Sequence, residues 1–182
     1  MPTLETLRGP WPAFLCELDG LLPSRVGIRC LGAFVLTAIY GAPRFTSDLD
    51  YLEVLPSAAG RVVEELAGRS SKLAKRHGLW VQRVGTGLVD LPENYEDRLQ
   101  ELDLGLKNLR LFVLEPYDLC LSKLTRNNPK DREDVKFFAQ QENLSYGTLY
   151  QRFASEMKPW VARADWHEGT LKKIWKEYFP QP

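Results

Sequence analysis

Two aspartates, Asp48 and Asp50, are spaced to act together, because they stand two residues apart at the head of a predicted strand. In an extended chain both side chains leave the same side of the sheet, with their Cα atoms roughly 6–7 Å apart. Two like charges at this spacing repel each other, so folding gains nothing from them alone. A divalent cation such as Mg²⁺, which takes a few carboxylate oxygens and keeps positions for phosphates and water, reverses that balance. An exposed strand end can also carry such a pair without any function.

The segment before this pair contains residue types that bind phosphate. Gly32 and Ala33 stand where a predicted strand gives way to a predicted helix, and the free amides and dipole of a helix start favour a phosphate. Arg44, four residues before Asp48, carries a guanidinium that can bind the same phosphate. A structural explanation, in which Gly32 only turns the chain and Arg44 pairs with Asp48, stays open. We favour phosphate binding, because three such features converge on one short segment.

A second group of charged residues spans two predicted helices, which the breaker at 127–129 separates. Lys123 and Arg126 are three residues apart, as are Asp131 and Asp134, so each pair shares one face of its helix. An antiparallel hairpin would bring the two pairs together. Lys123 is then a candidate to bind the β- or γ-phosphate, and Asp131 to orient an acceptor hydroxyl or to hold Lys123. Asp131 and Asp134 also suit a helix start, and for Asp134 we favour that structural role.

The composition is that of an ordinary globular protein. The chain has 182 residues, and its 24 basic and 24 acidic side chains cancel, which argues against binding of duplex nucleic acid by charge alone. Its three cysteines are far apart among apolar residues, so we expect free thiols in a reducing compartment. No apolar run reaches the about 20 residues that span a membrane, and no secretory signal is visible. We therefore expect a cytoplasmic protein with no membrane partner.

Hydrophobic periodicity and breaker residues predict mixed strands and helices, followed by helices alone. The predicted strands are 26–31, 49–55, 79–84, 88–91 and 109–114. The predicted helices are 4–22, 33–40, 57–76, 116–126, 131–141, 145–157 and 165–178, with 92–108 a loop or a single helical turn. This order indicates an α/β or α+β fold in a single domain. We expect a core over 1–141 and a helical C-terminal extension over 142–182 that packs on it.

The same motifs resemble those of a known superfamily. A strand, a glycine, an apolar helix and then Pro43-Arg44-Phe45-Thr46-Ser47-Asp48-Leu49-Asp50 resemble the first motif of the nucleotidyltransferases, especially the minimal AbiEii-like branch. Residues 114–119, 122–126 and 130–135 resemble the second conserved region of that branch. The resemblance covers about residues 26–140, and the C-terminal helices resemble those of an uncharacterised group within the superfamily.

The resemblance implies a nucleotidyltransferase-like mixed sheet flanked by helices. It also implies a Mg²⁺-dependent enzyme that moves a nucleoside monophosphate from a nucleoside triphosphate to an acceptor hydroxyl. Asp48 and Asp50, with help from a third acid, would hold two Mg²⁺ ions. The triphosphate would be positioned by Gly32, Ala33, Arg44 and Lys123. The acceptor would be an RNA such as tRNA, or a protein, and the chain could be a toxin with a cognate antitoxin.

Two features depart from the family pattern. Members usually carry Gly-Gly or Gly-Ser at the turn, where this chain has Gly32-Ala33. The third metal-binding carboxylate is expected on a later neighbouring strand. Asp90, at the end of the predicted strand 88–91, is our candidate, although an ordinary turn residue would look the same. Glu53 is a poorer choice, because regular alternation puts it on the opposite face from Asp48 and Asp50. These departures motivate a second hypothesis, an inactive module of the same fold that binds nucleotide or a partner protein.

Overall fold

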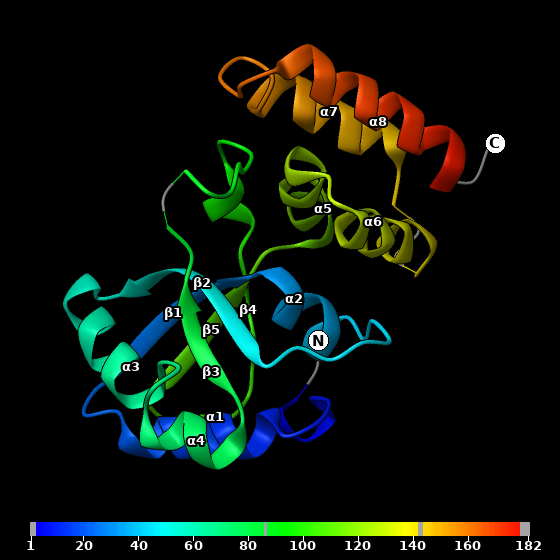
Figure 1. Ribbon diagram of the computed structural model, residues 1–182. Helices are drawn as coiled ribbons and strands as arrows, with labels where there is room; N and C mark the ends of the chain where they lie inside the picture. Colours follow the sequence, from blue (N-terminus) through cyan, green and yellow to red (C-terminus); the bar gives the residue numbers. More distant parts are fainter. Residues whose placement is uncertain (1–2, 86, 142–143, 179–182) are drawn as a thin grey trace. The chain divides into compact units, whose positions relative to one another are not determined.

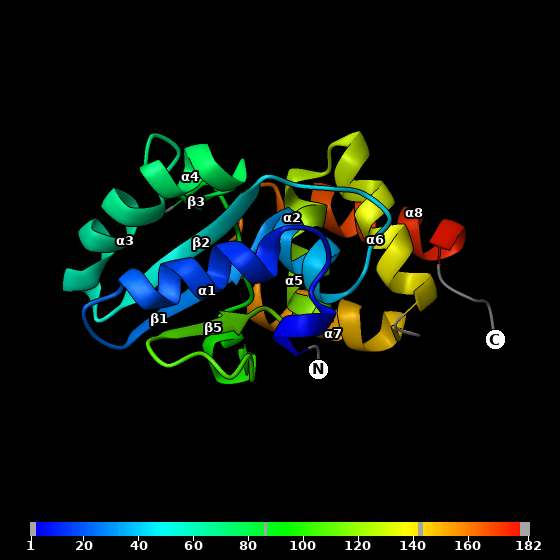
Figure 2. The same cartoon turned by 90° about the horizontal axis from the view of Figure 1, so that it is seen from below.

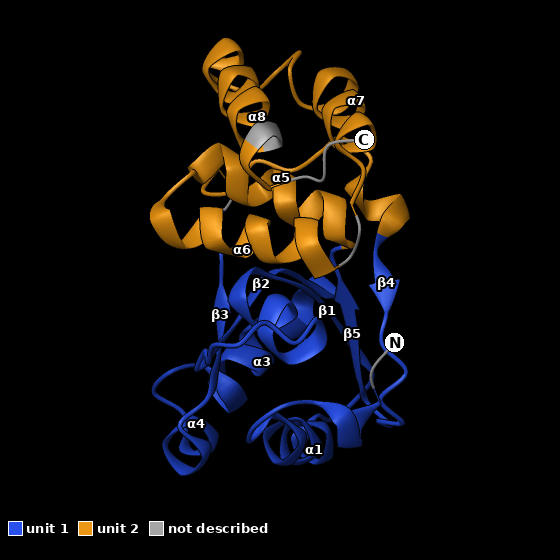
Figure 3. Ribbon diagram, turned by 90° about the vertical axis from the view of Figure 1, so that its right-hand side faces the viewer, with its two compact units in different colours: residues 1–86, 99–114 blue, residues 87–98, 115–182 orange. Residues whose placement is uncertain are grey.

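The computed structural model describes residues 3–85, 87–141 and 144–178. The chain divides into two compact units, which Figure 3 colours separately. Unit 1 comprises residues 1–86 and 99–114, and unit 2 comprises residues 87–98 and 115–182. Within the described part, no helix combines the length and the apolar character needed to cross a membrane.

Unit 1 is built on a five-stranded mixed sheet with strand order β3-β2-β1-β5-β4. Its strands are β1 (Val26–Leu31), β2 (Asp48–Leu55), β3 (Trp80–Arg83), β4 (Gln100–Glu101) and β5 (Leu109–Val113). The central strand β1 pairs with β5 in parallel and with β2 in antiparallel orientation, and β3 then joins β2 in parallel. The mixed α/β fold with helices around the sheet is therefore confirmed.

The helices of unit 1 are α1 (Trp11–Leu21), α2 (Gly32–Phe34), α3 (Gly60–Ala67) and α4 (Lys72–His77). Three short helical segments join them: η1 (Leu4–Thr6), η2 (Val35–Ile39) and η3 (Ser57–Ala59), of which η2 is a π-helix. Figures 1 and 2 show α1, α3 and α4 along one face of the sheet. The core on that face is aromatic, and the ring centroids of Trp11 and Phe34 lie 4.7 Å apart.

The alternation of the strands explains which face is buried. Ile28 and Cys30 of β1 pair with Val54 and Tyr51 of β2, and all four side chains are buried. The phenol of Tyr51 donates a 2.8 Å hydrogen bond to Glu64 of α3, which places this set on the helix-covered face. The residues between them point to the other face, which is where β2 carries its acidic side chains.

Unit 2 is helical. It contains the short η4 (Tyr95–Arg98) and the helices α5 (Pro116–Arg126), α6 (Pro129–Gln141), α7 (Tyr146–Glu156) and α8 (Ala164–Tyr178). Helix α5 begins where the side chain of Glu115 accepts from the amide of Asp118, and it ends at Asn127, which adopts a left-handed conformation with φ 50°. That reversal makes α5 and α6 an antiparallel pair, and α5 also contacts α7 and α8. The division at 114/115 thus differs from the expected boundary at 141/142, because α5 and α6 group with the C-terminal helices.

Several local predictions were wrong. The apolar run 88–91 forms no strand, and the side chain of Leu88 is 72% exposed. The predicted helix 57–76 is broken, because Gly68 leaves the helical conformation with ψ 165° and Ser71 caps a new helix by accepting from the amide of Ala74. The segment 92–108, predicted as a loop or one turn, does contain one helical turn, η4, but the short strand β4 within it was missed. The helix predicted over 4–22 was expected together with a bend from Gly9, Pro10 and Pro12; a bend lies at residues 9–10, and α1 begins after it at Trp11.

Candidate functional site

The acidic pair lies where the sequence places it, at the start of β2. Asp48 and Asp50 are half-buried, whereas Leu49 and Tyr51 between and after them are buried on the helix-covered face. Both carboxylates therefore project from the other face of the sheet, which none of α1, α3 and α4 covers. This confirms that the pair shares one face.

The glycine bend and the second aspartate come together. Asp50 pairs with Leu31, the last residue of β1, and Gly32 follows Leu31 directly. Gly32 has φ +75°, and a side-chain carbon there would lie 3.0 Å from Cβ of Asp50 and would overlap its carboxylate. Only glycine combines this backbone conformation with the free space that the Asp50 carboxylate occupies. The structure thus brings together two residues that lie eighteen positions apart in the sequence.

The charge of Asp50 also acts on Cys30 of the neighbouring strand β1. Burial, and after it the charge of Asp50, raise the pKa of the Cys30 thiol. Cys30 is fully buried, so this thiol stays neutral and acts as a small apolar core residue.

Asp48 is held by a neighbour that sequence reasoning did not select. The hydroxyl of Thr46 donates to the Oδ1 atom of Asp48. A threonine two residues before an aspartate is a recognisable signal, because short hydroxyl side chains often bond to carboxylates and amides close by in sequence. Thr46 therefore orients the first carboxylate of the pair.

The remaining residues predicted to bind phosphate belong to the same unit. Ala33 is half-buried in α2, and its carbonyl accepts a 2.8 Å hydrogen bond from the hydroxyl of Thr37. Arg44 lies in the exposed segment that leads into β2, where its amide donates to the carbonyl of Ala42 at 2.8 Å. Their roles in binding a triphosphate stay predictions.

Strand β3 contributes two side chains to the acidic face, and neither was predicted. In the parallel β2–β3 register, Trp80 is the partner of Asp48 and Gln82 is the partner of Asp50. The Nε1 atom of Trp80 donates to Oε1 of Gln82 at 3.5 Å, and the guanidinium of Arg69 lies 5.0 Å from the centroid of the indole ring. Among the residues that the structure describes, no group of three or more His, Cys, Asp and Glu side chains could hold a metal ion.

Glu53 is placed differently from the sequence-based expectation. A bulge between Arg29 and Cys30 in the β1–β2 register shifts the alternation, so that Glu53 pairs with Arg29 and Tyr51 with Cys30. Glu53 consequently shares a face with Asp50. Its carboxylate is bound to the guanidinium of Arg29 at 2.9 Å, however, so it forms part of an ion pair further along the strand.

Asp90, the candidate third metal ligand, does not lie on a strand. It belongs to unit 2, in the segment that the sequence analysis assigned to a strand over 88–91. Asp90 lies near His167, which belongs to the first turn of α8. Burial lowers the pKa of His167, and the negative charge of Asp90 partly offsets that effect. The register that would have placed Asp90 beside β2 is therefore absent, and its role as a metal ligand stays a prediction.

The α5–α6 hairpin brings the second charged group together, as predicted. The Nζ atom of Lys123 lies 2.7 Å from Oδ2 of Asp134 and 3.9 Å from Oδ1 of Asp131. All three side chains are at most 5% exposed. The favoured role of Asp134 as a capping residue is not what the structure shows, because Asp134 is the closest partner of Lys123.

Asp131 is the residue that caps α6. Its amide donates to the side chain of Asn128 at 2.9 Å, and its carboxylate accepts from the amide of Asn128 at 3.2 Å, which is a reciprocal capping box. The guanidinium of Arg126 binds the same carboxylate through two hydrogen bonds of 2.6 and 2.8 Å. Asp131 is thus fully occupied by contacts within unit 2.

A second buried ionic network, absent from the sequence analysis, joins three segments of unit 2. Arg98 donates to both oxygens of Asp118, which is 1% exposed, and to both oxygens of Glu156. Arg152 binds Asp118 at 2.8 Å and also binds Glu115. The network ties residues 87–98 to α5 and α7. In the sequence these residues are only charges spread over about 60 positions. Their pairing becomes visible only in the structure.

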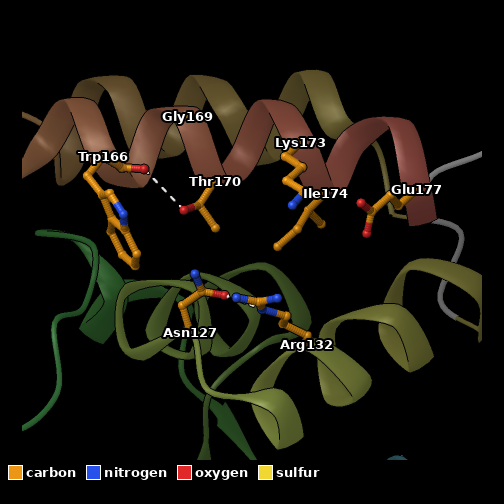
Figure 4. Close-up of a pocket in the computed structure, with 8 residues that line it drawn as sticks. All are labelled: Asn127, Arg132, Trp166, Gly169, Thr170, Lys173, Ile174 and Glu177. Atoms are coloured by element: carbon orange, nitrogen blue, oxygen red, sulfur yellow. Dashed lines mark hydrogen bonds between the residues drawn. The ribbon is translucent and has the colours of Figure 1, made fainter.

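Unit 2 also contains a cavity of about 350 Å³ between α8 and the turn that joins α5 to α6. Figure 4 shows Trp166 and Lys173 reaching toward it from α8, with Arg132 and Asn127 opposite. Arg132 donates to Oδ1 of Asn127 at 2.9 Å, and Trp166 is 46% exposed. The cavity thus combines an exposed aromatic ring with two cations, although Glu177 also lines it.

Comparison with known proteins gives one match. Residues 30–181 match the family model described as nucleotidyltransferase of unknown function (DUF6036). The match begins in β1, includes the acidic pair and the α5–α6 hairpin, and extends through α8. No curated protein and no solved structure matches the chain.

Proposed function

Because this chain belongs to the DUF6036 family of nucleotidyltransferases, we propose that it moves a nucleoside monophosphate from a nucleoside triphosphate to an acceptor hydroxyl. One observation carries the proposal. Asp48 and Asp50 project from the sheet face that α1, α3 and α4 leave uncovered, beside a glycine whose missing side chain leaves room for the Asp50 carboxylate. Two carboxylates that leave one face of a strand at this spacing are the kind of oxygen donors that Mg²⁺ binds.

The donor set fits Mg²⁺. This ion is commonly bound by one or two carboxylates together with substrate phosphates, so the two aspartates suffice without a group of three protein ligands, of which the described residues hold none. Asp48 and Asp50 would hold two Mg²⁺ ions, as the resemblance implies. When bound, the metal lowers the pKa of the acceptor hydroxyl and neutralises charge on the departing pyrophosphate.

The contribution of the protein is alignment. Thr46 fixes the orientation of the Asp48 carboxylate, and Gly32 allows the backbone to approach Asp50 closely. The backbone amides of Gly32 and Ala33 and the guanidinium of Arg44 would bind the triphosphate and hold its α-phosphorus in line with the acceptor oxygen. None of these contacts involves a covalent bond between protein and substrate, so catalysis rests on positioning and electrostatics.

Lys123 and Asp131 make structural contacts within unit 2. In the structure the ammonium of Lys123 is bound to Asp134, and Asp131 caps α6, so both stabilise the α5–α6 hairpin. A direct contact between Lys123 and the triphosphate, or between Asp131 and the acceptor, stays a prediction.

We propose RNA as the acceptor in preference to a protein. The cavity of unit 2 supports this choice, because an exposed indole and two cations are the groups on which single-stranded bases stack and phosphates bind. A role as a toxin with a cognate antitoxin, and a place in the AbiEii-like branch, are further predictions from the resemblance.

The central experiment is incubation with Mg²⁺, total RNA and each of the four α-³²P-labelled nucleoside triphosphates. We expect label on RNA with the wild type and none with Asp48→Asn/Asp50→Asn. The melting temperature of the variant is measured alongside, and a cooperative transition close to that of the wild type excludes misfolding as the cause. Label on protein would instead support the protein acceptor.

The second hypothesis is an inactive module that binds nucleotide, and the uncharged β3 partners of Asp48 and Asp50, Trp80 and Gln82, favour it. Calorimetry with Mg²⁺ and each nucleoside triphosphate separates the two. Nucleotide binding without pyrophosphate release in the presence of RNA and protein extracts would support the module. Binding that persists in Asp48→Asn/Asp50→Asn would show that the acidic pair is not the site.

The RNA acceptor has its own test. Trp166→Ala should weaken binding of a fluorescent single-stranded RNA by about tenfold, since one base stack contributes about 1–3 kcal/mol. Trp160→Ala is the matched control, because Trp160 is 49% exposed in the same unit but does not line the cavity. Equal effects of the two substitutions would remove the support for RNA.

A further inference from the structure

The neutral side chain of Gln82 stands beside the acidic pair. In the parallel β2–β3 register, Gln82 is the partner of Asp50, and neighbouring strands lie about 4.8 Å apart. Partner residues of a parallel pair project from the same face, so the Gln82 amide and the Asp50 carboxylate point in the same direction. Gln82 is exposed, and β3 is the edge strand, so no further strand covers it.

The indole of Trp80 contacts the Gln82 amide, and Arg69 in turn contacts the indole. The indole of Trp80 donates its N–H to Oε1 of Gln82 at 3.5 Å, which is a long hydrogen bond. Arg69 lies 5.0 Å from the centroid of that indole and restricts it from one side. A side-chain carbonyl with two lone pairs can accept this bond and still bind a cation.

An amide and a carboxylate differ in charge, and this difference sets how a site binds Mg²⁺. With Gln82 the three groups carry a charge of −2, whereas an acid at the same position would give −3. Mg²⁺ gives up its water reluctantly, so a small negative charge is a weak competitor for its hydration shell. The phosphates of a nucleotide bring the missing negative charge and further oxygen ligands.

We propose that Gln82 is the third metal-facing residue, and that its neutral amide makes the site bind Mg²⁺ tightly only together with the polyphosphate of the substrate. The inference rests on the proposed function and deepens it. Metal and nucleotide then bind as a unit, so the apoprotein does not accumulate a metal that has no substrate to act on. Gln82 accordingly couples the binding of the metal to that of the nucleotide and leaves the chemical step to the acidic pair.

The test measures metal binding directly, by titration with Mn²⁺ followed by electron paramagnetic resonance, with inorganic tripolyphosphate as the probe for the substrate's phosphates. We expect weak Mn²⁺ binding to the wild type alone. Tripolyphosphate should raise the affinity of the protein for Mn²⁺ at least about tenfold. This comparison is made after subtracting the Mn²⁺ that free tripolyphosphate binds without protein. Gln82→Glu should tighten Mn²⁺ binding without tripolyphosphate by about tenfold, because one added unit charge near a divalent ion has an effect of this order even in water.

Gln100→Glu is the matched control. It makes the same chemical change on β4, at the opposite edge of the sheet, where Gln100 accepts a 3.4 Å hydrogen bond from Tyr40 that a glutamate also accepts. We expect no change in Mn²⁺ affinity for this variant. Gln82→Leu, which keeps the shape but removes the oxygen, should weaken the tripolyphosphate-dependent binding severalfold. Melting temperatures of all variants verify that each is folded.

The outcomes separate this inference from the function on which it rests. If Gln82→Glu and Gln82→Leu both bind Mn²⁺ within twofold of the wild type, Gln82 does not face the ion and the inference is wrong. If the wild type alone binds Mn²⁺ as tightly as with tripolyphosphate, the coupling is wrong. If Asp48→Asn/Asp50→Asn leaves tripolyphosphate-dependent binding unchanged, the acidic pair is not the metal site and the proposed function itself fails.

Discussion

The Nζ atom of Lys123 lies 2.7 Å from Oδ2 of Asp134, and the two side chains are only 3% and 5% exposed. The pair joins α5 to α6 inside unit 2. A buried ion pair contributes little compared with apolar residues of the same shape, but removing one partner leaves an uncompensated charge in a medium of low polarity. The pair therefore fixes the hairpin geometry, and each residue depends on the other.

We predict that Lys123→Met and Asp134→Leu each lower the free energy of unfolding by about 3–5 kcal/mol. The double variant should cost much less than the sum, because neither charge is left alone. Urea denaturation followed by circular dichroism measures all three. The exposed pair Arg61–Glu65, with side chains 89% and 63% exposed, is the control, and Arg61→Ala should cost less than about 1 kcal/mol. Additive losses in the double variant would contradict a buried, coupled pair.

The same double variant tests whether Lys123 has a catalytic role. If Lys123 only positions the hairpin, the Lys123→Met/Asp134→Leu protein should fold and keep its KM for nucleoside triphosphate. If Lys123 binds the β- or γ-phosphate, the folded double variant should show a KM raised about tenfold or more, since a charge-assisted hydrogen bond is lost. The variant's melting temperature separates loss of fold from loss of a contact.

Gly32→Ala is predicted to abolish activity with a modest loss of stability. An alanine side chain at position 32 would overlap the Asp50 carboxylate. It would also put an L residue at φ +75°, and this backbone strain costs about 1–2 kcal/mol. Displacement of a catalytic carboxylate by about 1 Å can lower the rate about 100-fold. Gly105→Ala is the matched control, because Gly105 has φ +64° but open space around its Cα. Equal losses of nucleotidyl transfer in both variants would show that backbone strain alone matters.

The regular elements were predictable where local chemistry decides them. Strands β1, β2 and β5 begin and end within one residue of the predicted bounds, because apolar and β-branched runs stand between glycine, proline and polar breakers. Helix α5 begins at Pro116 as expected, since Pro is favoured in the first turn. The meeting of Gly32 with Asp50 follows from the same patterns once β1 and β2 are neighbours.

Pairing between strands could not be predicted, and the errors in the site come from it. The position of Gln82 depends on the parallel register of β3 against β2, which leaves no local signal in either segment. The bulge opposite Arg29 moved Glu53 to the acidic face, although a period-two pattern indicates the opposite. The run 88–91 looked like a strand because it is apolar, but it has no neighbouring strand to pair with.

Arg98 is predicted to anchor residues 87–98 to the helices of unit 2. Its guanidinium binds Asp118 and Glu156, so Arg98→Ala leaves Asp118, which is 1% exposed, with fewer partners. We expect a loss of about 2–4 kcal/mol and faster amide hydrogen exchange over residues 87–98. Arg110→Ala removes an arginine from an exposed pair with Glu101 and should change neither quantity appreciably. Unchanged exchange in Arg98→Ala would show that other contacts hold this segment.

Glu168 on α8 is predicted to make the helical unit sensitive to acid. Hydrogen bonds from Lys158, Lys172 and Tyr150 lower the pKa of Glu168 from 4.5 to about 2. Because the folded state holds the proton less tightly than the unfolded state, the contribution of Glu168 is complete above pH 4.5 and is lost as the pH falls toward 2.

Thermal melts between pH 2 and 6 should therefore show a steeper fall in the melting temperature of the wild type than of Glu168→Gln. The two curves should approach each other as the pH nears 2, where the wild-type carboxylate becomes protonated as well. Glu133→Gln, which neutralises an exposed acid on α6 that does not belong to the Glu168 cluster, serves as the control and should follow the wild-type curve. A Glu168→Gln curve parallel to the wild type over this range would mean that the three hydrogen bonds do not persist in solution.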